Sequence, residues 1–180
     1  MKNNNPIYFT LWFTGLPCSG KSTIAEEIKK ELLKRNLDVD LLDGDVIRAN
    51  ISSDLGFTKK DIIENNRRVM NLCKTLNNQN KIAIVAVVSP FEETRKLARQ
   101  TIPNYAEIFV DCPVEECIKR DTRGLYRKAR NNEIENFIGI HVKYELPQNP
   151  DLTIITINTN LDYNVKKVLE KLVEKKYLPH

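Results

Sequence analysis

Residues 15–22, which read GLPCSGKS, constrain the fold of this chain more than any other segment. They match a phosphate-binding pattern in which two glycines enclose four residues and are followed by lysine and serine. An apolar stretch at 7–14 precedes them, and Ile24, Ile28 and Leu32 recur after them at helical spacing. The segment therefore predicts a strand, a loop and a helix, with loop N–H groups and the helix dipole attracting phosphate.

We expect this loop to bind ATP. Lys21 reaches the outer phosphates, and Ser22 supplies a hydroxyl ligand to the Mg²⁺ that bridges the same oxygens. The residues expected to contact ATP are Gly15, Leu16, Pro17, Cys18, Ser19, Gly20, Lys21, Ser22, Thr23 and Arg120. The alternative is a glycine turn with a solvated lysine, which the strand and helix on either side disfavour.

The rest of the chain alternates strands with helices. Further strands are predicted at 39–42, 81–88, 106–110 and 152–157, and helices at 22–35, 58–76, 92–101, 113–120 and 164–176. Residues 81–88 are a continuous apolar run after the first lysine, as in parallel strands covered on both faces. We predict a single α/β domain over 1–180: a nucleoside-kinase-like P-loop fold, with a doubly wound parallel sheet of about five strands and helices on both faces.

Composition excludes several other classes of protein. The 180 residues are 41% hydrophobic and 29% charged, as in ordinary globular domains, and the net charge of +4 is too small to predict general binding to nucleic acid or membranes. The first residues show neither a signal-peptide layout nor a membrane span, so we expect a cytoplasmic chain. Its cysteines, Cys18, Cys73, Cys112 and Cys117, form no Cys-x-x-Cys pair, and reduced thiols are expected rather than a zinc site.

Two carboxylates follow the second predicted strand. Asp43 and Asp45 should lie at the carboxyl edge of the sheet, beside the loop, where they could order Mg²⁺ and accept a proton from an incoming hydroxyl. An ordinary acidic turn is the alternative. Arg48 follows on a predicted short helix and is expected to hold an anionic substrate. An Asn-Lys-x-Asp segment after a later strand is absent from the sequence, which favours a small-molecule kinase over a GTPase.

A basic, irregular stretch covers about residues 122–149. Loops of this length in a compact domain are usually functional, so we expect a lid. Its cationic side chains, together with Arg120 shortly before it, should surround the transferring phosphates and exclude water on closing. These residues are Arg120, Arg123, Arg127, Lys128 and Arg130. A solvated basic loop is the alternative.

The chain resembles the adenylylsulfate kinase family over about residues 10–150. The matching segments, in order, are 15–23, 42–45 with Arg48, 54–57, 64–65, 67–69, 89–90, 109–111, 120–121, 124–126, 128–130, Phe137, 139–140, 144–145 and Pro147. The resemblance implies transfer of the γ-phosphate of ATP to the ribose 3′-hydroxyl of adenylyl sulfate. The product is 3′-phosphoadenylyl sulfate, as in sulfate assimilation.

The same resemblance implies roles for individual residues. Asp45 is implied as the base or hydroxyl-positioning residue and Asp43 as the carboxylate on the Mg²⁺ side. With Lys21 of the phosphate loop, they are the predicted catalytic residues. The residues implied to bind the acceptor are Asp45, Arg48, Phe57, Asn65, Ser89, Lys128 and Phe137. The two phenylalanines would enclose the base, and core packing is the alternative for either alone. Family members are often dimeric, which leaves a homodimer open.

Four positions depart from the family pattern: Val46, Ala49, Ile62 and His141 stand where the family has asparagine, histidine, arginine and aspartate. Loss of one charged hydrogen bond is worth about 1.5–3 kcal/mol, enough to redirect the choice of acceptor. An alternative acceptor is therefore cytidine diphosphoramidate, the substrate of a family branch in capsule biosynthesis. Two further alternatives are a catalytically silent nucleotide-binding protein and a polynucleotide end kinase, the latter suggested only by the basic lid.

Overall fold

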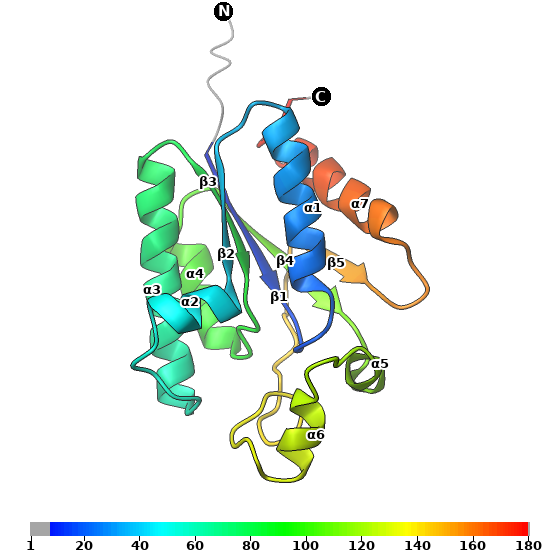
Figure 1. Cartoon of the computed structure of the whole chain (residues 1–180). Coiled ribbons are helices and arrows are strands. Elements are labelled where there is room, and N and C mark those ends of the chain that lie inside the picture. Colours follow the sequence, from blue (N-terminus) through cyan, green and yellow to red (C-terminus); the bar gives the residue numbers. More distant parts are fainter. Residues whose placement is uncertain (1–7, 180) are drawn as a thin grey trace, which may run out of the picture.

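The computed structural model describes residues 8–179, which are built around one five-stranded parallel sheet. The strands lie in the order β2-β3-β1-β4-β5 (Figure 1). Their bounds are β1 (Thr10–Thr14), β2 (Val39–Asp43), β3 (Ile82–Ala86), β4 (Tyr105–Asp111) and β5 (Leu152–Ile155). The predicted parallel α/β fold is confirmed. The polar segment 1–6 and Ile7 of the first predicted strand lie outside the described residues.

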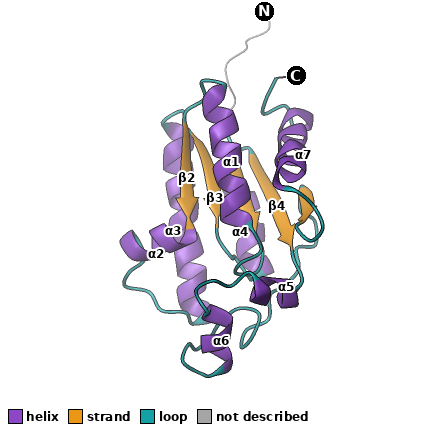
Figure 2. Ribbon diagram, turned by 45° about the vertical axis from the view of Figure 1, so that its right-hand side comes forward, coloured by secondary structure: helices purple, strands orange, loops and turns teal. Residues whose placement is uncertain are grey.

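Helices cover both faces of this sheet (Figure 2). They are α1 (Lys21–Lys34), α2 (Gly44–Asn50), α3 (Lys59–Asn78), α4 (Glu92–Thr101), α5 (Val114–Lys119), α6 (Leu125–Arg130) and α7 (Leu161–Glu174). Side chains alternate between the two faces along a strand. In β1, Leu11 and Phe13 therefore pack in the cluster that includes α1 and α7, whereas Trp12 packs in the one that includes α3 and α4. Within residues 8–179, the helices are all too short or too polar to cross a membrane.

Several predicted boundaries differ by a few residues. Strand β3 ends at Ala86 rather than at residue 88, β5 ends at Ile155 rather than at residue 157, and α3 ends at Asn78 rather than at residue 76. Helix α7 begins at Leu161 rather than at residue 164, because the Asn160 side chain caps it from the preceding position. Local capping thus moves the start of α7 by a few residues.

The prediction of an irregular stretch over 122–149 is wrong for residues 125–130, which form α6. Gly124 precedes this helix at φ +67°, a conformation that favours glycine. Asp121 Oδ2 accepts a hydrogen bond from the Tyr126 N–H at 2.7 Å, which satisfies a free donor of the first turn. Figure 1 shows α6 beyond the carboxyl ends of the strands, at the edge where the loop after β1 also lies.

A buried arginine joins α4 to the sheet. The Arg95 side chain is 1% exposed, donates to the Ser89 carbonyl at 2.6 Å, and lies 3.5 Å from Glu107 on β4. Its guanidinium also lies over the Tyr144 ring, 5.4 Å from the centroid. Burial raises the pKa of Glu107, against the opposing influence of Arg95 and Arg99. Arg95 therefore holds together the end of β3, β4 and the segment that leads to β5.

We expect Arg95→Met to lower the free energy of unfolding by about 3–5 kcal/mol, because it removes one partner of a buried ion pair. The matched control is Arg99→Met. Arg99 also pairs with Glu107, at 3.4 Å, but its side chain is 37% exposed, so its loss should cost about 1 kcal/mol or less. Urea unfolding of both variants measures the difference, and equal losses would contradict the role given to Arg95.

Candidate active site

The loop between β1 and α1 curls tightly because two of its residues adopt left-handed backbone angles. Cys18 has φ +62° and Gly20 has φ +103°. Gly15 lies so close to β4 that a Cβ there would stand 2.5 Å from the carbonyl oxygen of Val110. A side chain at position 15 is therefore excluded without a shift of the backbone, and the loop is held against the carboxyl edge of the sheet.

Lys21 is buried within this loop. Its Nζ donates to the carbonyls of Gly15 at 3.0 Å and Leu16 at 2.7 Å, and the residue is 7% exposed. Burial lowers the pKa of Lys21 from 10.5 to about 8, although the nearby Asp43 and Asp45 carboxylates act in the opposite direction. The ammonium group is thus held at the centre of the loop with two carboxylates close by.

Asp43 ends β2 and is oriented toward the loop by two hydrogen bonds. Its Oδ1 caps α2 by accepting from the Asp45 N–H at 3.0 Å, and its Oδ2 accepts from Ser22 Oγ at 2.6 Å. Carboxylate and hydroxyl oxygens are ligands that suit Mg²⁺. Residues 8–179 contain no group of three or more His, Cys, Asp or Glu side chains placed to hold a metal. The oxygens of Ser22 and Asp43 fit the usual Mg²⁺ arrangement, in which substrate phosphates complete the ligand set.

Asp45 lies on the first turn of α2 and meets the basic segment. Its Oδ2 is 2.6 Å from Arg123 Nη1, and both side chains are largely exposed. Arg123 also lines a cavity of about 460 Å³ together with Lys21, Ser22 and Arg120. The structure therefore brings the second carboxylate, the loop lysine and the arginines of the 120–123 segment to one edge of the sheet.

Arg120 is attached to the loop through a residue that sequence reasoning missed. Its guanidinium donates to Thr156 Oγ1 at 3.1 Å and to the Thr156 carbonyl at 2.9 Å. Thr156 Oγ1 in turn donates to the Ser19 carbonyl at 3.0 Å. The only sequence signal for Thr156 is its place at the end of the last strand, on the edge where ligands bind in such sheets.

The residues expected to surround the acceptor base are not all in contact with one another. Arg48 Nη1 donates to the Gly56 carbonyl at 2.6 Å, and its guanidinium lies 4.8 Å from the centroid of the Phe57 ring. Phe57 is 56% exposed, which excludes core packing as its role. Phe137 instead packs edge-on against Tyr126, with ring centroids 4.9 Å apart. Among the aromatic pairs of residues 8–179, the two phenylalanines form no contact with each other.

Two other acceptor candidates are buried with a free polar atom. Asn65 on α3 and Ser89 after β3 are 6% and 2% exposed, and neither Asn65 Oδ1 nor Ser89 Oγ has a hydrogen-bond partner among the described residues. Buried polar atoms are rarely left unpaired, so these two are available to a ligand. Ile62, one turn before Asn65, packs in an apolar cluster with Phe91. Lys128 lies exposed on α6.

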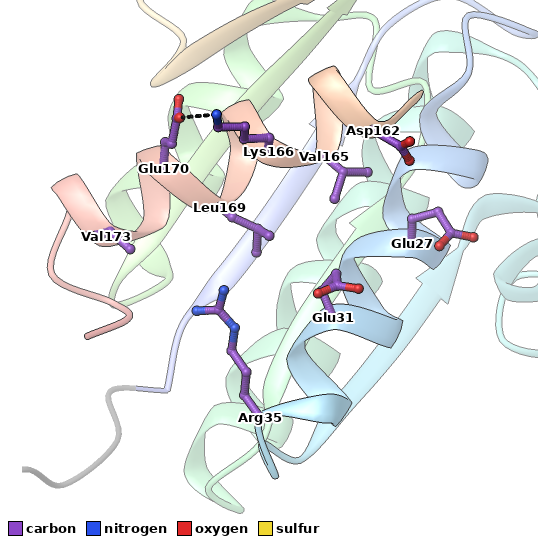
Figure 3. Close-up of a pocket in the computed structure, with 9 residues that line it drawn as sticks. All are labelled: Glu27, Glu31, Arg35, Asp162, Val165, Lys166, Leu169, Glu170 and Val173. Carbon is purple, nitrogen blue, oxygen red and sulfur yellow. Dashed lines mark ion pairs between the residues drawn. The ribbon is translucent and has the colours of Figure 1, made fainter. Parts of the chain in front are cut away.

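A larger hollow, of about 600 Å³, lies elsewhere, between α1 and α7. Figure 3 shows Val165 and Leu169 of α7 facing α1, with Glu27 and Glu31 along the side of α1. It contains none of the residues that the sequence predicts for catalysis or binding. The cavity beside Lys21, although smaller, is therefore the candidate active site.

The sheet order, the glycine loop after β1 and the carboxylates after β2 define a P-loop phosphotransferase. Solved structures agree on this fold at low identity, including a gluconokinase from Sinorhizobium meliloti with a TM-score of 0.64 and 15% identity. The family model for adenylylsulphate kinase matches residues 8–155. The chain belongs to the adenylylsulphate kinase family, so the resemblance seen in its motifs is confirmed.

Individual relatives extend this match over nearly the whole chain. The adenylyl-sulfate kinase of Halothermothrix orenii is 42% identical over 178 residues, which cover 99% of this chain and 95% of the relative. That of Thermodesulfovibrio yellowstonii is 47% identical over 82% of this chain and 75% of the relative. The Mycobacterium tuberculosis APS kinase CysC, solved in complex with AMPPNP and APS, superimposes with a TM-score of 0.89 at 37% identity, covering 94% of this chain and 99% of that one.

The lowered pKa of Lys21 predicts how stability depends on pH. Between about pH 8, where the folded chain loses this proton, and pH 10.5, where the unfolded chain does, the unfolded state binds more protons. Stability therefore rises with pH in this window. We expect wild type to gain up to about 3 kcal/mol relative to Lys21→Met across it, and nothing below it. Urea unfolding of both proteins at several pH values measures this difference, and a difference independent of pH would contradict a buried ammonium.

Proposed function

We propose that this protein is an adenylyl-sulfate kinase, which transfers the γ-phosphate of ATP to the ribose 3′-hydroxyl of adenylyl sulfate. The observation that carries the proposal is that one cavity is lined by Lys21, Ser22 and Arg123, while Ser22 bonds Asp43 and Arg123 pairs with Asp45. Phosphoryl transfer needs little covalent chemistry from a protein. It depends on holding donor and acceptor in line and neutralising the charge on the transferring group.

The donor half of the site is the loop with Arg120. The N–H groups of residues 15–23, Pro17 excepted, hold the phosphates of ATP, and the Lys21 ammonium exchanges its loop carbonyls for phosphate oxygens. Arg120, fixed through Thr156, adds positive charge at the same cavity. Ser22 and Asp43 would hold Mg²⁺ together with the phosphates, and the ion would supply positive charge to offset the charge that develops on the transferring group. AMPPNP and APS together in the mycobacterial relative support this division into a donor and an acceptor half.

The acceptor half contains Asp45 and the side chains around it. Asp45 takes the proton of the 3′-hydroxyl, or orients that hydroxyl, once Arg123 releases its carboxylate. Asn65 Oδ1 and Ser89 Oγ, which lack protein partners, contact the acceptor together with Arg48 and Lys128. Phe57 and Phe137 enclose the base when the lid over about 122–149 closes.

The same proposal includes the cellular location, the substrate class and the assembly of the protein. The chain acts as one domain in the cytoplasm, where ATP is present and thiols stay reduced; its four cysteines are free. It takes small nucleotides rather than nucleic acids or membranes. Its proposed assembly is a homodimer. An APS kinase from Thiobacillus denitrificans is hexameric; it is 30% identical with a TM-score of 0.72, and the match covers 94% of this chain but 29% of that one.

The proposal is tested by measuring ADP release from Mg²⁺-ATP with a panel of acceptors. The panel holds adenylyl sulfate, other nucleoside phosphosulfates, cytidine diphosphoramidate and an oligonucleotide. We expect turnover with adenylyl sulfate above all others. Preference for the cytidine compound would overturn the choice of acceptor, and no turnover with any of them would overturn the kinase assignment itself.

We expect Asp45→Asn to lower kcat by roughly 10²–10⁴ while ATP binding is kept, because the amide cannot accept the hydroxyl proton. The matched control is Asp38→Asn. Asp38 is an exposed carboxylate that pairs with Lys81 at 3.7 Å and lies outside the candidate site. Steady-state kinetics and ATP titration of both variants check the prediction, and near-normal turnover of Asp45→Asn would remove Asp45 from the role of base.

A further inference from the structure

A tight turn over residues 137–142 carries one of the two proposed base-stacking rings. The Phe137 carbonyl accepts hydrogen bonds from the N–H groups of His141 at 2.9 Å and Val142 at 3.2 Å. Gly139 makes the turn possible with φ +93°, and a Cβ there would stand 3.1 Å from Leu16 of the phosphate loop. The turn therefore packs directly against the donor half of the site.

One side chain closes this turn from the other direction. The Phe137 N–H donates to His141 Nδ1 at 3.2 Å. Among residues 8–179, no other acceptor contacts this N–H. The Nδ1 atom is separated from its Cα by three bonds, as is Oδ1 of aspartate or asparagine. Histidine at position 141 thus offers an acceptor at the place where the family's aspartate would offer one.

The position of Phe137 matters because its ring is linked to the phosphate loop. The ring packs edge-on against Tyr126 at 4.9 Å, and Tyr126 Oη donates to the Pro17 carbonyl at 2.9 Å. A change in the backbone at Phe137 moves the ring relative to Tyr126 and the loop. The hydrogen bond to His141 therefore determines where the acceptor-side ring stands relative to the donor site.

We propose that His141 is a positioning residue for acceptor binding, acting through the Phe137 N–H and without touching either nucleotide. The inference rests on the proposed function for the stacking role of Phe137. It also explains one departure from the family pattern. Histidine in place of aspartate at position 141 keeps the turn in place, so this difference does not alter the choice of acceptor.

The test compares His141→Ala, which removes the acceptor atom, with His141→Asn, which restores one at the same number of bonds from Cα. We expect His141→Ala to raise the KM for adenylyl sulfate about 3- to 10-fold, the loss of one neutral hydrogen bond. The kcat and the KM for ATP should stay close to wild type. His141→Asn should return the KM to within about twofold of wild type.

A second measurement separates this inference from the proposed function. Amide hydrogen exchange at Phe137, followed by NMR without substrate, should accelerate in His141→Ala and return to the wild-type rate in His141→Asn. Wild type inactive with every acceptor would defeat the proposed function and leave the exchange result to decide on the hydrogen bond. Unchanged exchange in His141→Ala, or an unchanged KM in an active enzyme, would overturn the positioning role, as would an asparagine variant no better than alanine.

Discussion

The rest of the site depends on the burial of the Lys21 ammonium group within the loop between β1 and α1. Lys21 is kept among the carbonyls of the loop it follows, at the cost of a lowered pKa. The loop keeps this conformation because Gly15 packs against the Val110 carbonyl of β4, where no side chain fits. Asp43 is held at the start of α1, because its carboxylate caps α2 and accepts a hydrogen bond from Ser22.

The two proposed halves of the site differ in how completely the protein itself satisfies their polar groups. In the donor half, Ser19, Thr156 and Arg120 form a continuous set of hydrogen bonds. In the acceptor half, two buried side-chain oxygens lack partners among the described residues. The set of bonds from Arg120 to Ser19 is formed before ATP binds, and on this account only Lys21 exchanges partners there, whereas the acceptor side gains its missing contacts with its substrate. A site that is completed only when the second nucleotide binds suits an enzyme that must keep water away from the transferring phosphate.

Much of this could be predicted from the sequence because the signals are local. The phosphate loop and Asp43 with Asp45 each lie within a few residues at the end of a strand, and parallel strands bring such ends to one edge. Thr156 and Arg95 could not be found in this way. Their partners are set by contacts between segments far apart in the chain. Helix α6 cannot be recognised in this way because its six residues are too few for a repeating apolar pattern to identify a helix.

The central claim is that a sugar hydroxyl, placed by Asp45, receives the γ-phosphate held by Lys21. The most direct measurement is phosphorus–proton correlation NMR of the nucleotide product formed from Mg²⁺-ATP and adenylyl sulfate. The account predicts a new phosphomonoester coupled to the proton on ribose C3′. A phosphate on any other atom, or inorganic phosphate as the sole product of ATP cleavage, would contradict it.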